Sequence, residues 1–366
     1  MTVKEQVYHF GFGVDANYVK YAGVLMTNLL YQHRKQPLCF HLACDGISEE
    51  DRRRLDAFTM QHSNVKLYIY DMTESLDRLN QIRSEAPQRL HRSVLLRVLL
   101  PQYVPQEVKR LVYMDADMIC LRRLDELFEL DLGRNAAAAV QEPNNEKKIV
   151  RLQLRGGRYF NAGLLVLDVA LWRQQELTQR VSSYYQQHSE ELLLLEQDAL
   201  NAVLDGAFTE LDKRFNFLVG ANNPLTIKYP EDAAILHCVN EAKAWTKGCM
   251  PQIYDLYWRY VRMSWWHDLQ PVEPTTAKAV FLAGVTAELQ GEYEQARKYY
   301  VAVINRFTEY YQNKEPQLLE EVRCKCLVAI AGEKQGEAAW AVRCYGLAAR
   351  RFMEQYLRDN PSLVNN

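Results

Sequence analysis

The first 240 residues alternate short apolar runs with longer stretches of helical pattern. Runs typical of strands occur at Val7–Val14, Leu38–Cys44, Val65–Tyr70, Lys109–Cys120, Ala136–Gln141, Tyr159–Asp168 and Ala233–Val239. Helices are predicted at Tyr18–His33, Ser48–Gln61, His91–Tyr103, Leu171–Gln187 and Leu192–Leu204. Because strands and helices take turns along the chain, the pattern predicts an α/β fold with a mostly parallel sheet covered by helices on both faces.

From about Pro274 the pattern is helical only, and the chain repeats itself. QGEYEQARKYYVAVINRF begins at Gln290 and QGEAAWAVRCYGLAARRF begins at Gln335, an offset of 45 residues. The pairs that match are Gly291/Gly336, Ala296/Ala341, Tyr300/Tyr345 and Phe307/Phe352. A turn glycine, small residues and aromatics at fixed spacing predict two related helical hairpins of tetratricopeptide-like type. They form either a cap that completes the core or a docking surface for a partner protein, a membrane complex or a second copy of the chain.

We therefore expect one α/β domain over residues 1–270 and an all-α helical-hairpin region over residues 271–366. The chain of 366 residues is long enough for a large domain and a smaller one. It is 48% hydrophobic and 25% charged, which is typical of globular proteins. A formal net charge of −2 gives no electrostatic reason to expect nucleic acid as a partner.

Several features favour a cytoplasmic protein. The eight cysteines show no C-x-x-C pair, so reduced thiols are expected. The N-terminus lacks the pattern of a secretory signal, and no apolar run approaches the roughly 18 residues needed to cross a bilayer. The aromatic stretch Tyr254–Leu269 is either a helix at the inner face of the membrane or a segment that packs the two regions together.

Two carboxylates interrupt the apolar segment RLVYMDADMIC, residues 110–120. Alternate residues of a strand point to the same face, so Asp115 and Asp117 are expected on one side. Side-by-side carboxylates repel each other and lose hydration, which a divalent cation compensates. The alternative is a strand end with solvated carboxylates. Ligands bind beyond the carboxyl ends of such strands, where Asp15 and Asp45 are also expected.

A third metal ligand is expected in HCVNEAKAW, which begins at His237. This loop offers an imidazole and, at Lys243, an ammonium group that could neutralise a phosphate. Two aspartates and one histidine favour Mn²⁺, with Mg²⁺ as the alternative because it prefers oxygen ligands. Gly11-Phe12-Gly13 lacks the third glycine of a dinucleotide fingerprint, and no P-loop motif is present.

Taken together, residues 5 to 265 resemble the glycosyltransferase family 8 enzymes, in particular the bacterial galactosyl- and glucosyltransferases that build lipopolysaccharide or lipooligosaccharide. The motifs that carry the resemblance are VDANY (14–18), FHLACDGIS (40–48), SVLLRVLLPQYVP (93–105), YMDADMIC (113–120), YFNAGLLVLDVALWR (159–173), EQDALN (196–201) and HCVNEAKAW (237–245). The resemblance implies a single GT-A-type nucleotide-sugar domain. It also implies a retaining, Mn²⁺-dependent transfer of glucose or galactose from a UDP-sugar to a hydroxyl of a cell-surface glycan or glycolipid.

The same resemblance assigns roles to individual positions. It implies a metal site made of Asp115, Asp117 and His237. It implies donor-binding residues at Asp15, Asn17, Tyr18, Arg97, Asp115, Ala116, Asn161, Ala162, Gly163, Glu196, Gln197 and Lys243. It places Gln197, Asp198, Lys243 and Arg97 at the reaction centre, with Gln197 under the anomeric carbon and Asp198 near the sugar hydroxyls.

Among the positions that depart from the pattern of the family are Glu196 and Asn240. Glu196 stands where the first acid of the D-Q-D-x-L-N helix start is an aspartate, and Asn240 replaces a glycine near the phosphate. These departures favour one competing hypothesis, a degenerate sugar-nucleotide fold that acts as a scaffold for the helical region. A second alternative is hydrolysis of the UDP-sugar without an acceptor. Retention of both aspartates, His237 and Lys243 argues for an active transferase.

Overall fold

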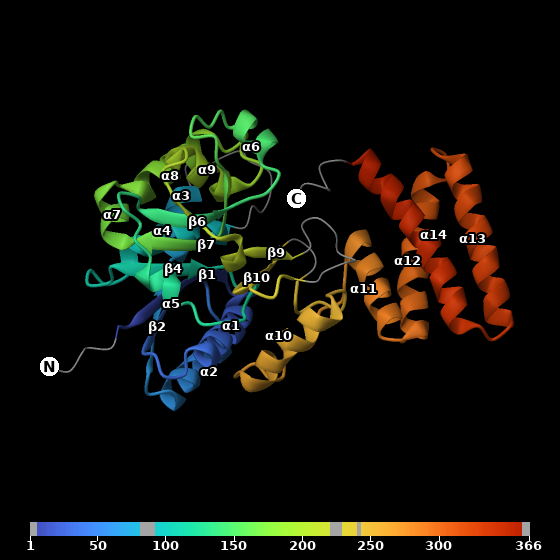
Figure 1. The fold of residues 1–366 in the computed structure, drawn as a ribbon, viewed down its shortest axis with the longest axis horizontal. Helices are drawn as coiled ribbons and strands as arrows, with labels where there is room; N and C mark the ends of the chain where they lie inside the picture. Colours follow the sequence, from blue (N-terminus) through green and yellow to red (C-terminus); the bar gives the residue numbers. More distant parts are fainter. Residues whose placement is uncertain (1–5, 81–91, 220–228, 240–242, 361–366) are drawn as a thin grey trace. The chain divides into compact units, whose positions relative to one another are not determined.

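The computed structural model describes residues 6–80, 92–219, 229–239 and 243–360 (Figure 1). These residues belong to two compact units. The first contains residues 1–217, 230–237 and 260–267, and the second contains residues 218–229, 238–259 and 268–366. The predicted domain boundary at residue 270 stays a prediction.

The first unit carries most of the strands. The strands of the chain are β1 (Tyr8–Asp15), β2 (Leu38–Asp45), β3 (Val65–Asp71), β4 (Arg110–Met114), β5 (Met118–Cys120), β6 (Ala137–Gln141), β7 (Phe160–Asp168), β8 (Thr209–Leu211), β9 (Phe217–Val219) and β10 (Ile235–Cys238). The helices up to residue 263 are α1 (Val19–Gln32), α2 (Glu49–Gln61), α3 (Thr73–Asn80), α4 (Leu96–Tyr103), α5 (Asp125–Glu129), α6 (Glu146–Arg151), α7 (Val169–Gln174), α8 (Leu177–Gln187), α9 (Leu195–Leu204) and α10 (Pro251–Met263).

Seven strands form a large sheet in the order β3-β2-β1-β4-β7-β6-β8. β7 runs antiparallel to its neighbours β4 and β6, and the other pairs are parallel. A smaller sheet contains β5 and β10, which are antiparallel. The predicted α/β fold with a mostly parallel sheet is confirmed.

Helices cover both faces of the large sheet (Figure 1). On one face α4, α7, α8 and α9 share an apolar core with β4, β6 and β7. The glycines of β1 allow α4 to lie close, since a Cβ on Gly11 would sit 2.7 Å from the Leu100 side chain and one on Gly13 would sit 2.8 Å from Leu96. This close packing explains the Gly-Phe-Gly sequence without any nucleotide fingerprint. On the other face Phe40 of β2 contacts Phe58 of α2, with ring centroids 6.0 Å apart.

Two predicted elements are divided in the structure. The run Lys109–Cys120, predicted as one strand, is split into β4 and β5, which belong to different sheets. The acidic residues lie at the turn between them, where the backbone can leave the apolar sheet. The predicted helix Leu171–Gln187 is split into α7 and α8 at Glu176, whose φ of 52° is left-handed. The helix predicted from His91 begins as a 3₁₀ turn at Arg92, and His91 lies outside the described residues.

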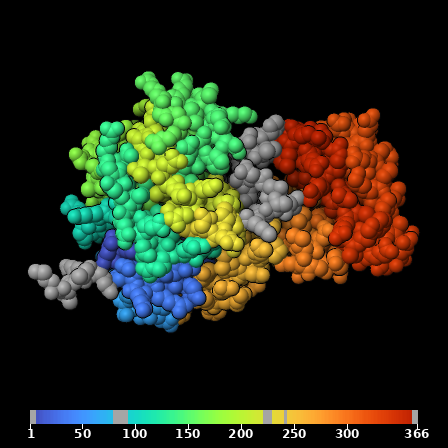
Figure 2. All heavy atoms as spheres, in the orientation of Figure 1, coloured from blue at the N-terminus to red at the C-terminus, as the bar shows by residue number. Residues whose placement is uncertain are grey.

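The second unit is mainly helical, and the predicted helical C-terminal region is confirmed. Its helices after residue 270 are α11 (Ala277–Leu289), α12 (Tyr293–Tyr311), α13 (Pro316–Lys334) and α14 (Ala338–Asp359). Their side chains pack into one continuous body, drawn in orange and red in Figure 2. The hairpins α11–α12 and α13–α14 carry the two copies of the sequence repeat.

The repeat extends to the hydrogen bonds. The Tyr300 hydroxyl donates to Glu288 Oε2 at 2.7 Å, and the Tyr345 hydroxyl donates to Glu333 Oε2 at 3.3 Å. Glu288 and Glu333 are themselves 45 residues apart, although the sequence comparison did not include them. The matched residues Ala296, Ala341, Phe307 and Phe352 are all buried. The two hairpins are therefore one structural unit used twice.

Trp266, near the end of the aromatic stretch Tyr254–Leu269, packs inward. Trp266 lies so close to α1 that a Cβ on Gly23 would sit 1.9 Å from its ring. The Trp266 indole N–H donates to Asp51 Oδ1 at 2.8 Å, and its side chain is buried. These contacts place Trp266 in the interior of the first unit, and the role of the stretch between the two regions stays a prediction. Among the helices of the described residues, none is both long and apolar enough to cross a bilayer.

Candidate active site

One edge of the large sheet gathers the predicted site residues. β1 and β4 end there, at Asp15 and next to Asp115, and β7 begins there because it runs in the opposite direction. The Asp115 backbone N–H donates to the Gly163 carbonyl at 2.8 Å. The antiparallel β7 thus brings the Asn161–Gly163 segment beside the acidic turn, although about 45 residues separate them in sequence.

Asp115, Asp117 and His237 converge on one point. Each offers a ligand atom, and these atoms lie within 4.8 Å of one another. His237 Nε2 is 3.1 Å from Asp117 Oδ1 and 3.9 Å from Asp115 Oδ2. The register of the smaller sheet makes this possible, because His237 on β10 pairs with Met118 on β5, one residue after Asp117. The three predicted metal ligands are therefore together.

Asn216 controls the orientation of the His237 ring. Asn216 Nδ2 donates to Asn161 Oδ1 at 2.9 Å, so its Oδ1 faces His237 Nδ1, also at 2.9 Å. With this orientation of the amide, Nδ1 carries the proton and the lone pair of Nε2 points at the two aspartates. A nitrogen lone pair that faces two carboxylates is unfavourable by itself. A cation bound between the three groups would make all three of them ligands.

Gly163 leaves the space in which these groups meet. A Cβ at this position would sit 2.3 Å from His237 Cε1 and 2.9 Å from Asp115 Oδ2. No side chain can therefore be added without moving a predicted ligand. The donor set of two carboxylates and one imidazole, together with this gap, fits a divalent metal ion such as Mn²⁺ or Mg²⁺.

Arg97 is a buried partner of the acidic turn. Its Nη2 lies 3.0 Å from Asp115 Oδ1 and 3.3 Å from Glu196 Oε1. Its Nη1 donates to the Ala162 carbonyl at 2.8 Å. Burial opposes the guanidinium charge, but the surrounding groups, of which Asp115 has the largest effect, together outweigh it, so the pKa of Arg97 is raised. In this structure the side chain predicted to reach the donor is bound to Asp115, which it holds in place.

Glu196 is buried at the start of α9. Burial raises its pKa to about 7, and the Arg97 guanidinium offsets part of this rise. A carboxyl group with this pKa exchanges its proton near neutral pH, unlike an ordinary glutamate. Glu196, the residue that departs from the family pattern, is thus the second acidic partner of the arginine.

The Gln197 amide is engaged on both sides. Its Oε1 accepts from the Ala162 backbone N–H at 2.9 Å. Its Nε2 donates to Glu142 Oε2 at 3.2 Å and to the Tyr159 hydroxyl at 3.0 Å. These bonds fix the side chain beside the Asn161–Gly163 segment, where the sequence predicted the donor sugar.

Asp198 is fully buried and serves as a hub of polar contacts. It accepts from Arg151 Nη2 at 2.8 Å, from the Tyr159 hydroxyl at 2.7 Å and from the backbone N–H groups of Leu193 and Leu194, both at 2.9 Å. Such a carboxylate positions the start of α9 and Tyr159. The contacts observed for Asp198 are with the protein, while the sequence predicted a contact with sugar hydroxyls.

The predicted nucleoside segment lies at the end of β1. Asp15 Oδ1 accepts from the backbone N–H groups of Asn17 at 2.9 Å and Tyr18 at 3.2 Å, forming the turn into α1. Asn17 is exposed and Tyr18 is half-buried, with its ring edge-on to Tyr21. Ala116 is buried in the turn between β4 and β5.

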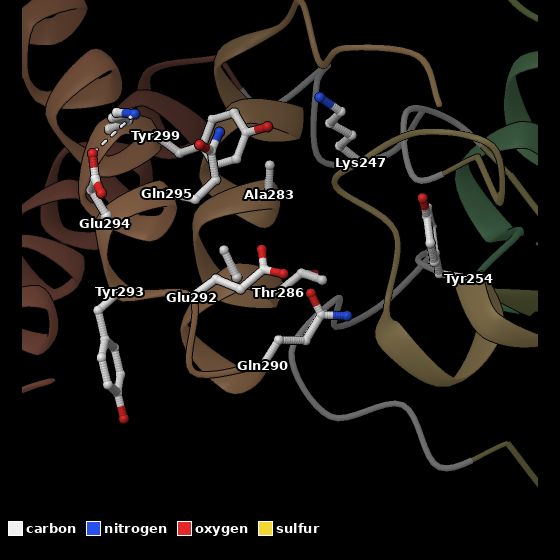
Figure 3. Close-up of a pocket in the computed structure, with 12 residues that line it drawn as sticks. Lys247, Tyr254, Ala283, Thr286, Gln290, Glu292, Tyr293, Glu294, Gln295 and Tyr299 are labelled. Carbon is white, nitrogen blue, oxygen red and sulfur yellow. Dashed lines mark ion pairs between the residues drawn. The ribbon is translucent and has the colours of Figure 1, made fainter. Parts of the chain in front are cut away.

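Lys243 belongs to the second unit and is half-buried, and Asn240 lies outside the described residues. The second unit also has a cavity of about 620 Å³ between Lys247, Tyr254 and the helices α11 and α12 (Figure 3). Its rim pairs Lys298 with Glu294 at 3.3 Å. None of the predicted site residues lines this cavity.

Sequence reasoning missed several residues that organise the site. They are Glu142, Arg151, Tyr159 and Asn216. Tyr159 was included only as the first letter of a motif, and the others carry no local signal. Their roles depend on contacts across 21 to 55 residues of sequence. Only the fold brings them to the site.

The class of protein follows from a comparison with known families. The family model for glycosyl transferase family 8 matches residues 9–249, well over half of the chain. The chain therefore belongs to glycosyl transferase family 8, as the sequence motifs predicted.

Known proteins similar to this chain include enzymes of lipopolysaccharide synthesis. The lipopolysaccharide 1,3-galactosyltransferase of Salmonella typhimurium (strain LT2) is 24% identical over 312 residues, which cover 82% of this chain and 91% of that protein. The general stress protein A of Bacillus subtilis (strain 168) is 25% identical over 282 residues, covering 73% and 97%. The lipopolysaccharide 1,2-glucosyltransferase of Escherichia coli (strain K12) is 26% identical over 272 residues, covering 71% and 79%.

A solved structure shares the fold. It is that of the galactosyltransferase LgtC in complex with donor and acceptor sugar analogs, with a TM-score of 0.58 and 22% identity. The match covers 72% of this chain and 97% of that one. The predicted GT-A-type α/β fold is confirmed.

Proposed function

We propose that this protein transfers glucose or galactose from a UDP-sugar to a sugar hydroxyl of a cell-surface glycan, with retention at the anomeric carbon and with Mn²⁺ as the metal. The observation that carries the proposal is the convergence of Asp115, Asp117 and His237 beside Gly163, whose lack of a side chain lets His237 and Asp115 come together. An enzyme that cleaves a sugar diphosphate needs positive charge at the leaving group, and such a ligand set can hold it.

The residues around the metal ligands have separate tasks in this proposal. Asp115, Asp117 and His237 would hold the ion, whose charge, when bound, stabilises the departing diphosphate. Arg97 keeps Asp115 in place through their 3.0 Å contact. Lys243 would bring a second positive charge to the diphosphate, and the loss of one such positioned group typically costs about 2.7–4 kcal/mol. Asp15, Asn17 and Tyr18 would hold the nucleoside.

The sugar would lie between Asn161–Gly163 and the start of α9. Gln197 is poorly suited to act as a nucleophile, because its amide oxygen already accepts the Ala162 N–H. We therefore favour attack by the acceptor on the face from which UDP leaves. The bond between acceptor oxygen and anomeric carbon forms, the bond to the phosphate oxygen breaks, and the acceptor proton passes to that phosphate. Gln197 would stabilise the positive charge that develops on the sugar.

The acceptor class is inferred from the similar proteins. Two of them are named as lipopolysaccharide galactosyl- or glucosyltransferases. We propose a lipopolysaccharide core or a related glycolipid, with the protein working at the inner face of the membrane. The paired helical hairpins would then be a surface for a partner protein or for a second copy of the chain.

The first experiment is isothermal titration of UDP into the protein with Mn²⁺ and with EDTA. We expect tight binding only with metal, lost in Asp117→Ala and kept in Asp131→Ala, an aspartate of an exposed loop. Absence of binding under both conditions in the folded wild-type protein would reject the transferase function and favour a scaffold. If UDP binds, product analysis with and without a glycan acceptor separates transfer from hydrolysis of the UDP-sugar.

A further inference from the structure

A second cluster of side chains that can bind a metal lies on β1 and β2, away from the edge of the large sheet where Asp15 and Asp115 lie. His9 pairs in register with Cys39, and His41 follows Cys39 by two residues, so the three side chains share one face of the sheet. His9 precedes Asp15 by six residues along β1, which corresponds to roughly 20 Å of strand. The cluster is thus separate from the candidate active site.

The distances within the cluster match those between the ligands of one metal ion. His9 Nδ1 lies 3.0 Å from His41 Nε2, and Cys39 Sγ lies 3.5 Å from the same nitrogen. All three ligand atoms lie within 4.8 Å of one another. Tetrahedral Zn²⁺ with its usual bond lengths places nitrogen ligands ~3.3 Å apart and sulfur ~3.5 Å from nitrogen. A shift of a few tenths of an ångström between the two imidazoles would admit the ion.

His41 is held with Nε2 turned toward the cluster. Its Nδ1 lies 2.9 Å from the Tyr70 hydroxyl, which can accept the ring proton. The Tyr68 ring stacks on the same imidazole, with centroids 5.4 Å apart and planes 5° apart. An outer hydrogen-bond partner that fixes the ring and its tautomer is the usual companion of a metal-binding histidine.

The surroundings suit a neutral nitrogen donor and a thiolate. His41 is fully buried, Cys39 is 3% exposed and His9 is half-buried, which leaves the ion one side open to water. Burial disfavours the imidazolium form of both histidines and also the free thiolate, so only a cation that binds sulfur strongly can displace the thiol proton. The charged groups that act on the cluster include Glu107, which favours the charged form of His9, and Lys66, which pairs in register with Cys39.

We propose that His9, Cys39 and His41 bind a thiophilic divalent cation, Zn²⁺, which ties β1 to β2. One sulfur and two nitrogen ligands match the preference of zinc, whereas the two carboxylates and one imidazole of the active site match Mn²⁺ or Mg²⁺. The chain would then carry two metal sites of different chemistry. This inference does not depend on the proposed transfer reaction.

The test is titration of the EDTA-treated full-length protein with Co²⁺, a spectroscopic substitute for zinc. We expect one equivalent to produce a sulfur-to-cobalt charge-transfer band that Zn²⁺ then abolishes. Cys39→Ser and His9→Gln should each lose the band or weaken Co²⁺ binding at least about tenfold. Cys44→Ser, which changes a buried cysteine of the same strand outside the cluster, should retain it.

Two controls keep the outcome clear. Asp117→Asn should keep the band, because that residue belongs to the other site. Circular dichroism reports whether each variant is folded, and His9→Gln, at a half-buried position, remains informative if Cys39→Ser unfolds. A wild-type protein without the band overturns the proposal. So does a band that persists unchanged in folded Cys39→Ser, since that would assign it to another thiol.

Discussion

His237 and Asn216 form a contact of 2.9 Å between Nδ1 and Oδ1, and this contact determines what the opposite nitrogen of the ring can do. Because the Asn216 amide is itself fixed by Asn161, the neutral imidazole presents its lone pair to the acidic turn. Asn216 thus determines which ring nitrogen of His237 is available to bind a metal ion.

Asn216→Ala should weaken Mn²⁺ binding by about 10- to 100-fold while the protein remains folded. The His237 ring would lose its fixed tautomer and orientation, but both carboxylates would remain. Titration of Mn²⁺ followed by electron paramagnetic resonance measures the affinity. The control is Asn135→Ala, which removes an amide bonded to Thr209. Unchanged affinity in Asn216→Ala would show that Asn216 does not orient the ligand.

Asp117→Ala and Gln197→Ala should differ strongly in transfer activity. Loss of the metal site removes several kcal/mol of stabilisation of the leaving group, or roughly 10³-fold or more in rate. Loss of an amide dipole costs less, on the order of 10- to 100-fold. Single-turnover rates with UDP-glucose and UDP-galactose provide the comparison. If Gln197→Ala were as inactive as Asp117→Ala, a covalent role for Gln197 would have to be considered again.

The pH dependence of stability should contain a contribution from Glu196. Its pKa is raised to about 7 in the folded protein from an ordinary value of 4.5, chiefly by burial. Between these pH values the native state binds more protons than the unfolded state, so the free energy of unfolding falls as pH rises through this window. The loss amounts to at most about 3 kcal/mol.

Urea unfolding in EDTA at several pH values between 4.5 and 8 measures this contribution. Glu196→Gln cannot ionise and should show a flatter profile between pH 4.5 and 7 than the wild-type protein. Glu190→Gln, at an exposed position, should follow the wild-type profile. Parallel profiles for Glu196→Gln and wild type would mean that Glu196 titrates as an ordinary glutamate.

The two turn glycines of the helical repeat should be energetically equivalent. Gly291 and Gly336 have φ values of 77° and 79°, and an added Cβ would meet nothing within 4 Å at either position. Substitution by alanine therefore costs backbone strain alone, about 1–2 kcal/mol each. Urea unfolding of Gly291→Ala and Gly336→Ala should give similar losses. Gln290→Ala, beside the first glycine, should be nearly neutral, and a neutral Gly336→Ala would contradict the equivalence.

Much of the architecture follows from local pattern. Alternation of apolar and helical segments predicted the mostly parallel order of the large sheet and all of its strands except β8, because burial on two faces produces continuous apolar runs in the sequence. The predicted helix Tyr18–His33 and the observed α1, Val19–Gln32, differ by one residue at each end. The repeat at 45 residues likewise predicted paired hairpins. In each case, the decisive interactions are local or periodic.

The places where prediction failed are changes of direction. Lys109–Cys120 is apolar throughout apart from its acids and its ends, so hydrophobic pattern alone gives one strand. The chain turns at Ala116 because the acidic side chains leave the apolar sheet, and the second half pairs with β10 from far along the chain. Glu176, whose backbone is left-handed, similarly separates α7 from α8. The break could not be predicted because this position is not a glycine.

By itself the sequence predicted that Asp115, Asp117 and His237 come together as a candidate metal site, because they lie in motifs whose chemistry is local. The tertiary structure alone decided what surrounds them. Arg97 joins Asp115 to Glu196, Asn216 orients His237, and Gly163 leaves the gap. These roles depend on contacts made across sheets and helices, and a buried ion pair or hydrogen bond has no fixed spacing in sequence. The types of residue at the site can therefore be predicted from the sequence, whereas their distances and contacts are defined only by the folded protein.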